Sequence, residues 1–198
     1  MLFTASAGFV NAGAVMACET VVSHITGSVT NLAADEPRAR DYVLVTASFI
    51  GGAMLAVLIS ETFRARPKLA FSLPVFASFG MLVAVGLVGK AGWFGPFGAG
   101  PTFTAAMVAM LAVLGAAMGM VNAAVANATN QQIRVAHLTG PATDLAGNLV
   151  RAALGTGKGT TTELRWASLR FAKVASFGVG AAACVKVSGA LEFDVFIA

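Results

Sequence analysis

The chain has 198 residues, of which 57% are hydrophobic and only 11% are charged, and its mean hydropathy is +0.80. Because a soluble domain carries roughly a quarter charged residues, this composition excludes an ordinary soluble protein. The net charge of +4 comes from basic residues scattered between apolar segments rather than gathered on one face. That distribution argues against nucleic acid as a partner and for the lipid bilayer.

Long uncharged runs predict membrane-spanning helices. Nineteen uncharged residues separate Asp41 from Glu61, 21 separate Lys68 from Lys90, and 43 separate Lys90 from Arg134, whereas a bilayer core needs about 20. In chain order the expected crossings are residues 3–22, 42–61, 69–89, 102–127, 165–184 and 187–198. The last is too short to cross and contains Glu192 and Asp194, so we expect a truncated crossing or an interfacial segment there. The fold class is therefore all-α: a polytopic membrane helix bundle of about six transmembrane helices, forming a single membrane domain over residues 1–198.

The connecting segments predict an orientation. Turns are expected around residues 35–41 and 61–68, in the aromatic loop Gly89–Pro101, and in the linker Gly155–Thr162. Counted over alternate loops, eight basic residues fall on one side and four on the other. The positive-inside rule then predicts a cytoplasmic N-terminus. Trp93, Phe94 and Phe97 are expected to anchor the aromatic loop at the outer interface.

A repeated motif is the strongest signal in the chain. The segment His24-Ile-Thr-Gly-Ser-Val-Thr-Asn-Leu-Ala33 recurs in the second part of the chain as His137-Leu-Thr-Gly-Pro-Ala-Thr-Asp-Leu-Ala146, with six of ten positions identical. Upstream, Gly8-Phe-Val-Asn-Ala12 recurs at nearly the same offset as Gly119-Met-Val-Asn-Ala123, and a weaker echo pairs residues 49–53 with 177–181. We therefore expect two homologous halves, near residues 1–90 and 100–198. Three crossings in each half would make them inverted repeats, and an even number would make them parallel.

The repeated Thr-Gly pair predicts a broken helix in each half. Glycine tolerates unusual backbone angles, and Pro141 suits the first turn of a helix that begins there. A helix that restarts inside a membrane presents free N–H groups and a positive dipole end, which favour an anion or a carbonyl oxygen. Because non-helical backbone at membrane depth needs protein or water around it, two such breaks suggest a shared polar cavity.

The candidate solute-binding residues come from both copies of the motif. Each copy contributes a histidine, the side-chain type most often used for proton transfer, and intramembrane acids are rare and often functional. The predicted solute site comprises His24, Thr26, Gly27, Thr30, His137, Thr139, Gly140, Thr143, Asp144, Asn11 and Asn122, with Glu19 as a proton-linked acid. The alternative is that the histidines and the Asn or Asp residues only cap or crosslink the broken helices. Asp144, Asn148 and Arg151 also share one face of an amphipathic segment, where an interfacial helix with an internal Asp–Arg contact is the other interpretation.

No enzymatic signature or cofactor site is found in the sequence. The segment Gly155-Thr-Gly-Lys-Gly-Thr160 lacks the first glycine and the Ser or Thr of a phosphate loop. Two histidines far apart in the sequence and two distant cysteines, Cys18 and Cys184, predict neither a metal site nor a disulfide. The expectation is therefore a protein that is not an enzyme.

The motifs around Asn11 and His24, and those around Asn122 and His137, resemble the YoaK family of small bacterial membrane proteins, a domain of unknown function. The resemblance covers most of the chain and implies a multi-helix inner-membrane protein with a permease-like role. Together with the motif chemistry, it leads to the hypothesis of a transporter that binds a small polar or anionic solute between two repeat halves. The alternative is an accessory structural subunit of a larger membrane complex, with other membrane subunits or a second copy as partners.

Overall fold

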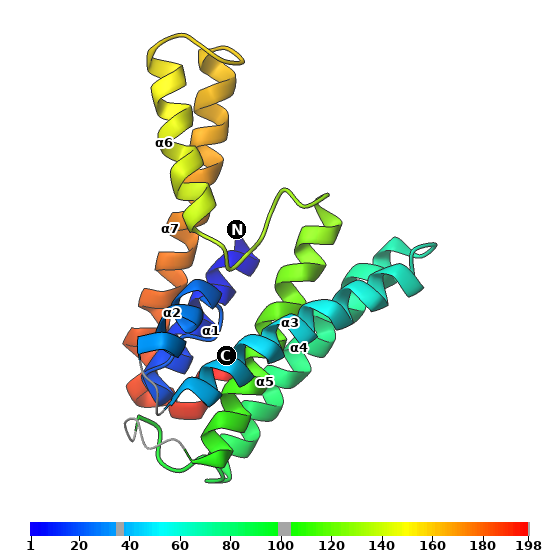
Figure 1. Ribbon diagram of the computed structural model, residues 1–198, viewed down its shortest axis with the longest axis vertical. Helices are drawn as coiled ribbons and strands as arrows, with labels where there is room; N and C mark the ends of the chain where they lie inside the picture. The colour runs from blue at the N-terminus through cyan, green and yellow to red at the C-terminus, as the bar shows by residue number, and fades with distance from the viewer. Residues whose placement is uncertain (35–37, 99–103, 198) are drawn as a thin grey trace.

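The computed structural model describes residues 1–34, 38–98 and 104–197, and these residues are folded into helices without any strand (Figure 1). This confirms the all-α prediction. The elements in chain order are α1 (Leu2–Cys18), α2 (Ile25–Ala34), α3 (Ala39–Thr62), α4 (Pro67–Lys90), α5 (Ala105–Ala128), α6 (Thr139–Ala153), α7 (Thr160–Leu191) and a short 3-10 helix, η2 (Glu192–Phe196).

Local sequence explains where several of these helices begin. Pro67 opens α4, where its missing N–H costs nothing. Thr104 caps α5, and its Oγ1 accepts a hydrogen bond from the backbone N of Met107 at 3.2 Å. The predicted linker before α7 contains Gly155, Gly157 and Gly159, all with positive φ, which turns the chain back after α6.

Four helices in the described part of the chain are long and apolar enough to cross a membrane: α3, α4, α5 and α7 with its continuation to Phe196. The apolar helix α1 is shorter, with 17 residues. In the most apolar window of α5, 56% of residues are buried inside the protein, against 17% in α3 and 22% in α4. The outer faces of α3 and α4 instead expose large apolar side chains such as Ile50, Met54, Leu58, Phe76 and Phe79. We infer that α5 is central and that these outer faces contact lipid.

The described residues of the segment 187–198 form no separate crossing. Residues up to Leu191 continue α7, and the residues from Glu192 to Phe196 form η2. In η2, Phe193, Val195 and Phe196 are at most 4% exposed. Three apolar side chains in this short segment stabilise a turn that packs back onto α4, α7 and α1 instead of starting a helix.

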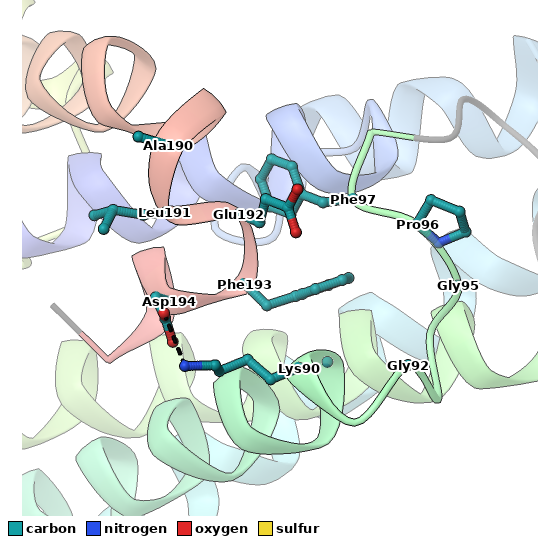
Figure 2. A pocket seen from close by; sticks show the side chains of 11 residues that line it. Lys90, Gly92, Gly95, Pro96, Phe97, Ala190, Leu191, Glu192, Phe193 and Asp194 are labelled. Carbon is teal, nitrogen blue, oxygen red and sulfur yellow. Dashed lines mark hydrogen bonds and ion pairs between the residues drawn. The ribbon is translucent and has the colours of Figure 1, made fainter.

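A cavity of about 530 Å³ lies where η2 meets the end of α4 and the aromatic loop (Figure 2). Phe193 packs edge-on against Phe97, with ring centroids 5.3 Å apart, and Lys90 forms an ion pair with Asp194 at 3.0 Å. The three aromatic residues predicted to anchor this loop at the interface therefore differ in their surroundings. Trp93 is 74% exposed, whereas Phe94 and Phe97 pack against the protein core.

The helices form two arms that diverge toward the top of Figure 1. The first arm contains α3, α4 and α5, and the second contains α1, α6 and α7. Helix α2 packs on α3, and contacts of α1 with α5 and of η2 with α4 join the arms. Each arm therefore combines helices from both predicted halves of the sequence.

Each arm depends on a close helix crossing at two glycines. In the second arm, a Cβ on Gly8 would lie 2.1 Å from the backbone oxygen of Phe177, and one on Gly180 would lie 1.9 Å from that of Ala5. In the first arm, a Cβ on Gly119 would lie 1.9 Å from the oxygen of Phe49, and one on Gly52 would lie 2.0 Å from that of Ala116. Only glycine permits this approach. The same matched positions occur at both crossings: Gly8 corresponds to Gly119 in the repeated motif, and Phe49 corresponds to Phe177 in the weaker echo.

Candidate functional site

The first helix break is stabilised by Asn11. Helix α1 ends at Cys18, and Glu19 adopts a left-handed conformation with φ 54°. The Oδ1 of Asn11 accepts hydrogen bonds from Val22 N at 3.2 Å, Ser23 N at 3.2 Å and Ser23 Oγ at 3.0 Å. These bonds satisfy backbone N–H groups that have left the helix, which is what a broken helix requires.

The second break follows the same plan with fewer bonds. The Oδ1 of Asn122, on α5, accepts a hydrogen bond from Ala136 N at 3.2 Å. The connection is longer here, and Thr129 organises it because its Oγ1 accepts a hydrogen bond from Ile133 N at 3.1 Å. Both α2 and α6 begin at the repeated motif, as predicted.

The two motif glycines allow each histidine to lie over the first turn of its helix. A Cβ on Gly27 would lie 2.9 Å from the His24 ring, and one on Gly140 would lie 3.0 Å from the His137 ring. Any larger side chain would displace the imidazole. These glycines therefore determine where the imidazoles lie, rather than supplying an unusual backbone angle.

A cavity of about 330 Å³ brings the two motif copies together. Twelve of its lining residues form six pairs that are separated by the spacings of the sequence motifs: Asn11 with Asn122, Ser23 with Ala136, His24 with His137, Ile25 with Leu138, Thr26 with Thr139, and Phe49 with Phe177. The remaining lining residue is Arg134, whose position in the first half is occupied by Val21. Segments that lie far apart in the sequence thus form one site.

The electrostatic environment of this cavity is positive. Arg134 lines it, and no carboxylate is among its lining residues. The neighbouring Lys173 on α7 is 9% exposed, and its Nζ donates a hydrogen bond to the backbone oxygen of His137 at 2.8 Å. Within the described ranges, no acidic group lies at ion-pair distance from Lys173 or Arg134. A cavity with a guanidinium in its lining, a second cation behind it and no carboxylate favours an anionic ligand.

Six of the predicted site residues line the cavity: Asn11, His24, Thr26, Asn122, His137 and Thr139. Thr30 and Thr143 do not line it, and their hydroxyls donate to backbone oxygens of their own helices, those of Thr26 at 2.9 Å and Thr139 at 3.1 Å. Glu19 lies exposed at the end of α1, so its proton-linked role stays a prediction.

The expected contact between Asp144 and Arg151 is wrong. Asp144 forms an ion pair with Arg170 at 3.2 Å, and Arg151 forms one with Glu163 at 3.2 Å. Glu163 also accepts hydrogen bonds from Asn148 Nδ2 and from Lys158 N. The polar face of α6 therefore pairs with α7, because the chain folds these two helices into a hairpin.

Sequence reasoning missed Lys173, Arg134 and the two phenylalanines of the cavity. The orientation count treats Lys173 as a loop cation, although it lies inside the predicted crossing 165–184, where an ionisable residue is a signal of function. Phe49 and Phe177 belong to the weaker echo between the halves, and nothing in the sequence linked that echo to the histidine motif. In the described part of the chain, no cluster of three or more His, Cys, Asp or Glu side chains is suited to a metal ion.

No curated protein and no solved structure matches the chain. A family model does match it, and it spans residues 1–193. The chain therefore belongs to the DUF1275 family of proteins of unknown function.

Proposed function

We propose that this protein is a membrane transporter that binds a small anionic solute in the cavity where the two motif copies meet. The observation that carries the proposal is the lining of that cavity, which holds both histidines of the chain and Arg134 but no carboxylate. A volume of about 330 Å³ is at the lower end of ligand sites. The solute is therefore small.

The hydrogen-bonding groups of the cavity favour an acceptor. The oxygens of the Asn11 and Asn122 amides face backbone N–H donors, so the Nδ2 group of each amide remains a donor without a partner in the described residues. The Thr26 and Thr139 hydroxyls line the cavity, and the first turns of α2 and α6 begin there. An oxyanion satisfies several of these donors at once, and hydrogen bonds to a charged group are stronger than those between neutral groups.

We further propose that the chain is an inverted duplication, with halves near residues 1–90 and 100–198. The exchange of partners at the glycine crossings supports this, because Gly8 contacts Phe177 while Gly119 contacts Phe49. The helix directions in Figure 1 also support it: α1 runs downward and α5 upward, and α3 runs upward and α7 downward. Inverted repeats with a shared central site are common in secondary transporters.

The proposed location is a bacterial inner membrane with a cytoplasmic N-terminus, in keeping with the resemblance to YoaK proteins. The basic turn between α3 and α4 and the one between α6 and α7 lie at the upper ends of the two arms, and the N-terminus points the same way. Arg64 and Arg66 belong to the first turn, Lys68 follows at the start of α4, and Lys158 belongs to the second turn. One cytoplasmic side for both turns satisfies the positive-inside rule.

The test is uptake by proteoliposomes that contain the full chain. The probes are radiolabelled acetate, butyrate, phosphate and sulfate, with methylammonium as the cationic control. We expect saturable uptake of at least one anion and none of methylammonium. The double variant His24→Gln/His137→Gln should reduce that uptake by about tenfold or more at solute concentrations below saturation, while its thermal unfolding midpoint stays close to that of the parent. Anion uptake no higher than in empty liposomes, or unchanged uptake by the folded double variant, contradicts the proposal.

One observation favours the accessory-subunit alternative. The hydrogen bonds that Asn11 accepts stabilise the break between α1 and α2, which is a structural role. This alternative predicts a stoichiometric protein partner in mass spectra of the protein extracted in mild detergent. A homo-oligomer or a monomer that retains a small anion supports transport instead.

A further inference from the structure

The two sides of the cavity differ in charge. Arg134 lines the cavity, and its counterpart in the first motif copy is Val21; Lys173 lies behind His137, and its counterpart at the Phe49–Phe177 spacing is Val45. Both differences add a cation to the second motif copy and none to the first. Among the residues that line the cavity and their direct hydrogen-bond partners, the two cations Arg134 and Lys173 lie on the side of His137.

The two motif copies also differ in the bonds that their asparagines accept. Ser23 gives Asn11 two of its three hydrogen bonds, whereas Ala136, at the matching position, gives Asn122 a single backbone bond. These bonds fix the first break more firmly than the second. The Nδ2 groups of both amides remain donors in the described residues, so the two asparagines do not distinguish the sides for an anion, and the difference between the sides rests on Arg134 and Lys173.

The geometry around His137 gathers these groups. His137 N donates a hydrogen bond to the Arg134 backbone oxygen at 3.4 Å, which closes a turn and keeps the two residues together. Lys173 Nζ anchors the same turn from α7 through the His137 oxygen at 2.8 Å. The Arg134 side chain has no hydrogen bond or ion pair within the part of the chain that the structure describes. A guanidinium in this position offers a planar fork that matches a carboxylate.

The rest of the lining is apolar. Phe49, Phe177, Ile25 and Leu138 complete the cavity. Apolar walls disfavour a fully hydrated ion such as sulfate, but they suit an anion that carries a short hydrocarbon group. With roughly 30 Å³ for each water-sized group, a volume of about 330 Å³ corresponds to about eleven non-hydrogen atoms, which accommodates butyrate and excludes a long-chain fatty acid.

We propose that the solute is a short-chain monocarboxylate that binds on the second-half side of the cavity. This inference rests on the proposed function. The Arg134 guanidinium binds the carboxylate directly, His137 donates to it, and Lys173 positions the His137 turn and adds positive potential. The hydrocarbon group lies against the two phenylalanines. His24 and the first motif copy hold the fold of the cavity and contribute little to affinity.

The experiment is isothermal titration of the full chain in detergent with butyrate and with butyramide, its uncharged analogue of nearly the same shape. Wild-type protein should prefer butyrate, and Arg134→Gln should weaken butyrate binding by about 10–100-fold, the effect of one charge-assisted contact. The same variant should leave butyramide binding nearly unchanged. Because Arg134 is exposed, its replacement should not alter the unfolding midpoint of the unliganded protein.

The histidines provide the matched control, since they occupy corresponding positions in the two copies. His137→Gln should weaken butyrate binding about tenfold, and His24→Gln less than about threefold. Lys173→Met should reduce the preference for butyrate over butyramide, whereas a purely structural role would weaken the two ligands equally. Equal effects of His24→Gln and His137→Gln, or unchanged butyrate binding in Arg134→Gln, overturn the assignment to the second-half side.

The failure of this inference is distinguishable from that of the proposed function. Binding of sulfate or phosphate without butyrate overturns the monocarboxylate while anion binding stands. If neither butyrate, acetate, phosphate nor sulfate binds, both proposals fail. Butyrate binding that depends on Arg134 and His137 supports both.

Discussion

The glycine crossings yield the sharpest prediction about stability. In Gly52→Ala the new Cβ would lie 2.0 Å from the backbone oxygen of Ala116, on the α3–α5 crossing. The adjacent Gly51 is the matched control, because a Cβ there meets nothing within 4 Å. The two variants share the same helix, the same residue change and the same gain in helix propensity.

The magnitude follows from the geometry. Real Cβ atoms essentially never approach within 3.0 Å of such an atom, so the obstructing backbone at Gly52 has to move by about 1 Å. Overpacking costs about 1–3 kcal/mol, and the upper end applies here because the obstacle is backbone that cannot rotate away. The Gly→Ala change returns up to about 1 kcal/mol of helix propensity. We expect a net loss of about 2 kcal/mol in the free energy of unfolding, a factor of about 30 in the folded-to-unfolded ratio.

The two free cysteines make the measurement direct. Cys18 and Cys184 are at most 1% exposed, so a thiol-reactive fluorogenic dye labels them only when the chain unfolds. Titration with sodium dodecyl sulfate in dodecylmaltoside micelles should unfold Gly52→Ala at a lower fraction of the ionic detergent than the parent. Gly51→Ala should match the parent or exceed it. Equal midpoints for the two alanine variants would refute the close crossing of α3 and α5.

Three further predictions use other contacts. Asn11→Ala should lower the free energy of unfolding by about 1–3 kcal/mol, because it leaves Val22 N and Ser23 N without an acceptor; Asn122→Ala, which removes one acceptor contact, should cost less in the same titration. Glu163→Gln should accelerate limited trypsin cleavage at Lys158 about tenfold, because the carboxylate contacts Arg151, Asn148 and the backbone N of Lys158 and so orders the turn. Unchanged cleavage would contradict that role. Phe193→Ala should lower the free energy of unfolding by about 3 kcal/mol or more, because the ring is only 4% exposed. Lys90→Met should change the unfolding midpoint little, because the Lys90–Asp194 ion pair is about half exposed. Similar losses in the two variants would show that the ion pair holds η2 in place.

Much of the architecture could be predicted from hydropathy and the motif alone. Uncharged runs identify α3, α4 and α5 because a helix that faces lipid has to be apolar along its whole length. The last crossing could not be predicted this way, since Phe193 and Phe196 are as apolar in a buried turn as they would be in a membrane helix. For α6, the polar spacing indicated one face but not the partners of that face, which are Arg170 and Glu163 on α7.

The sequence by itself determined the residue types of the candidate site. Asn11, His24 and Thr26 recur as Asn122, His137 and Thr139, and the helix breaks follow from local chemistry that acts over a short stretch of chain. Only the tertiary structure decided that both copies line one cavity and that Lys173 lies behind His137. The reason is physical: these contacts join residues on different helices, and their distances depend on how closely Gly8 and Gly119 let those helices cross. The spacing of residues along the chain does not specify how closely two helices cross, because that distance is set only when the helices pack.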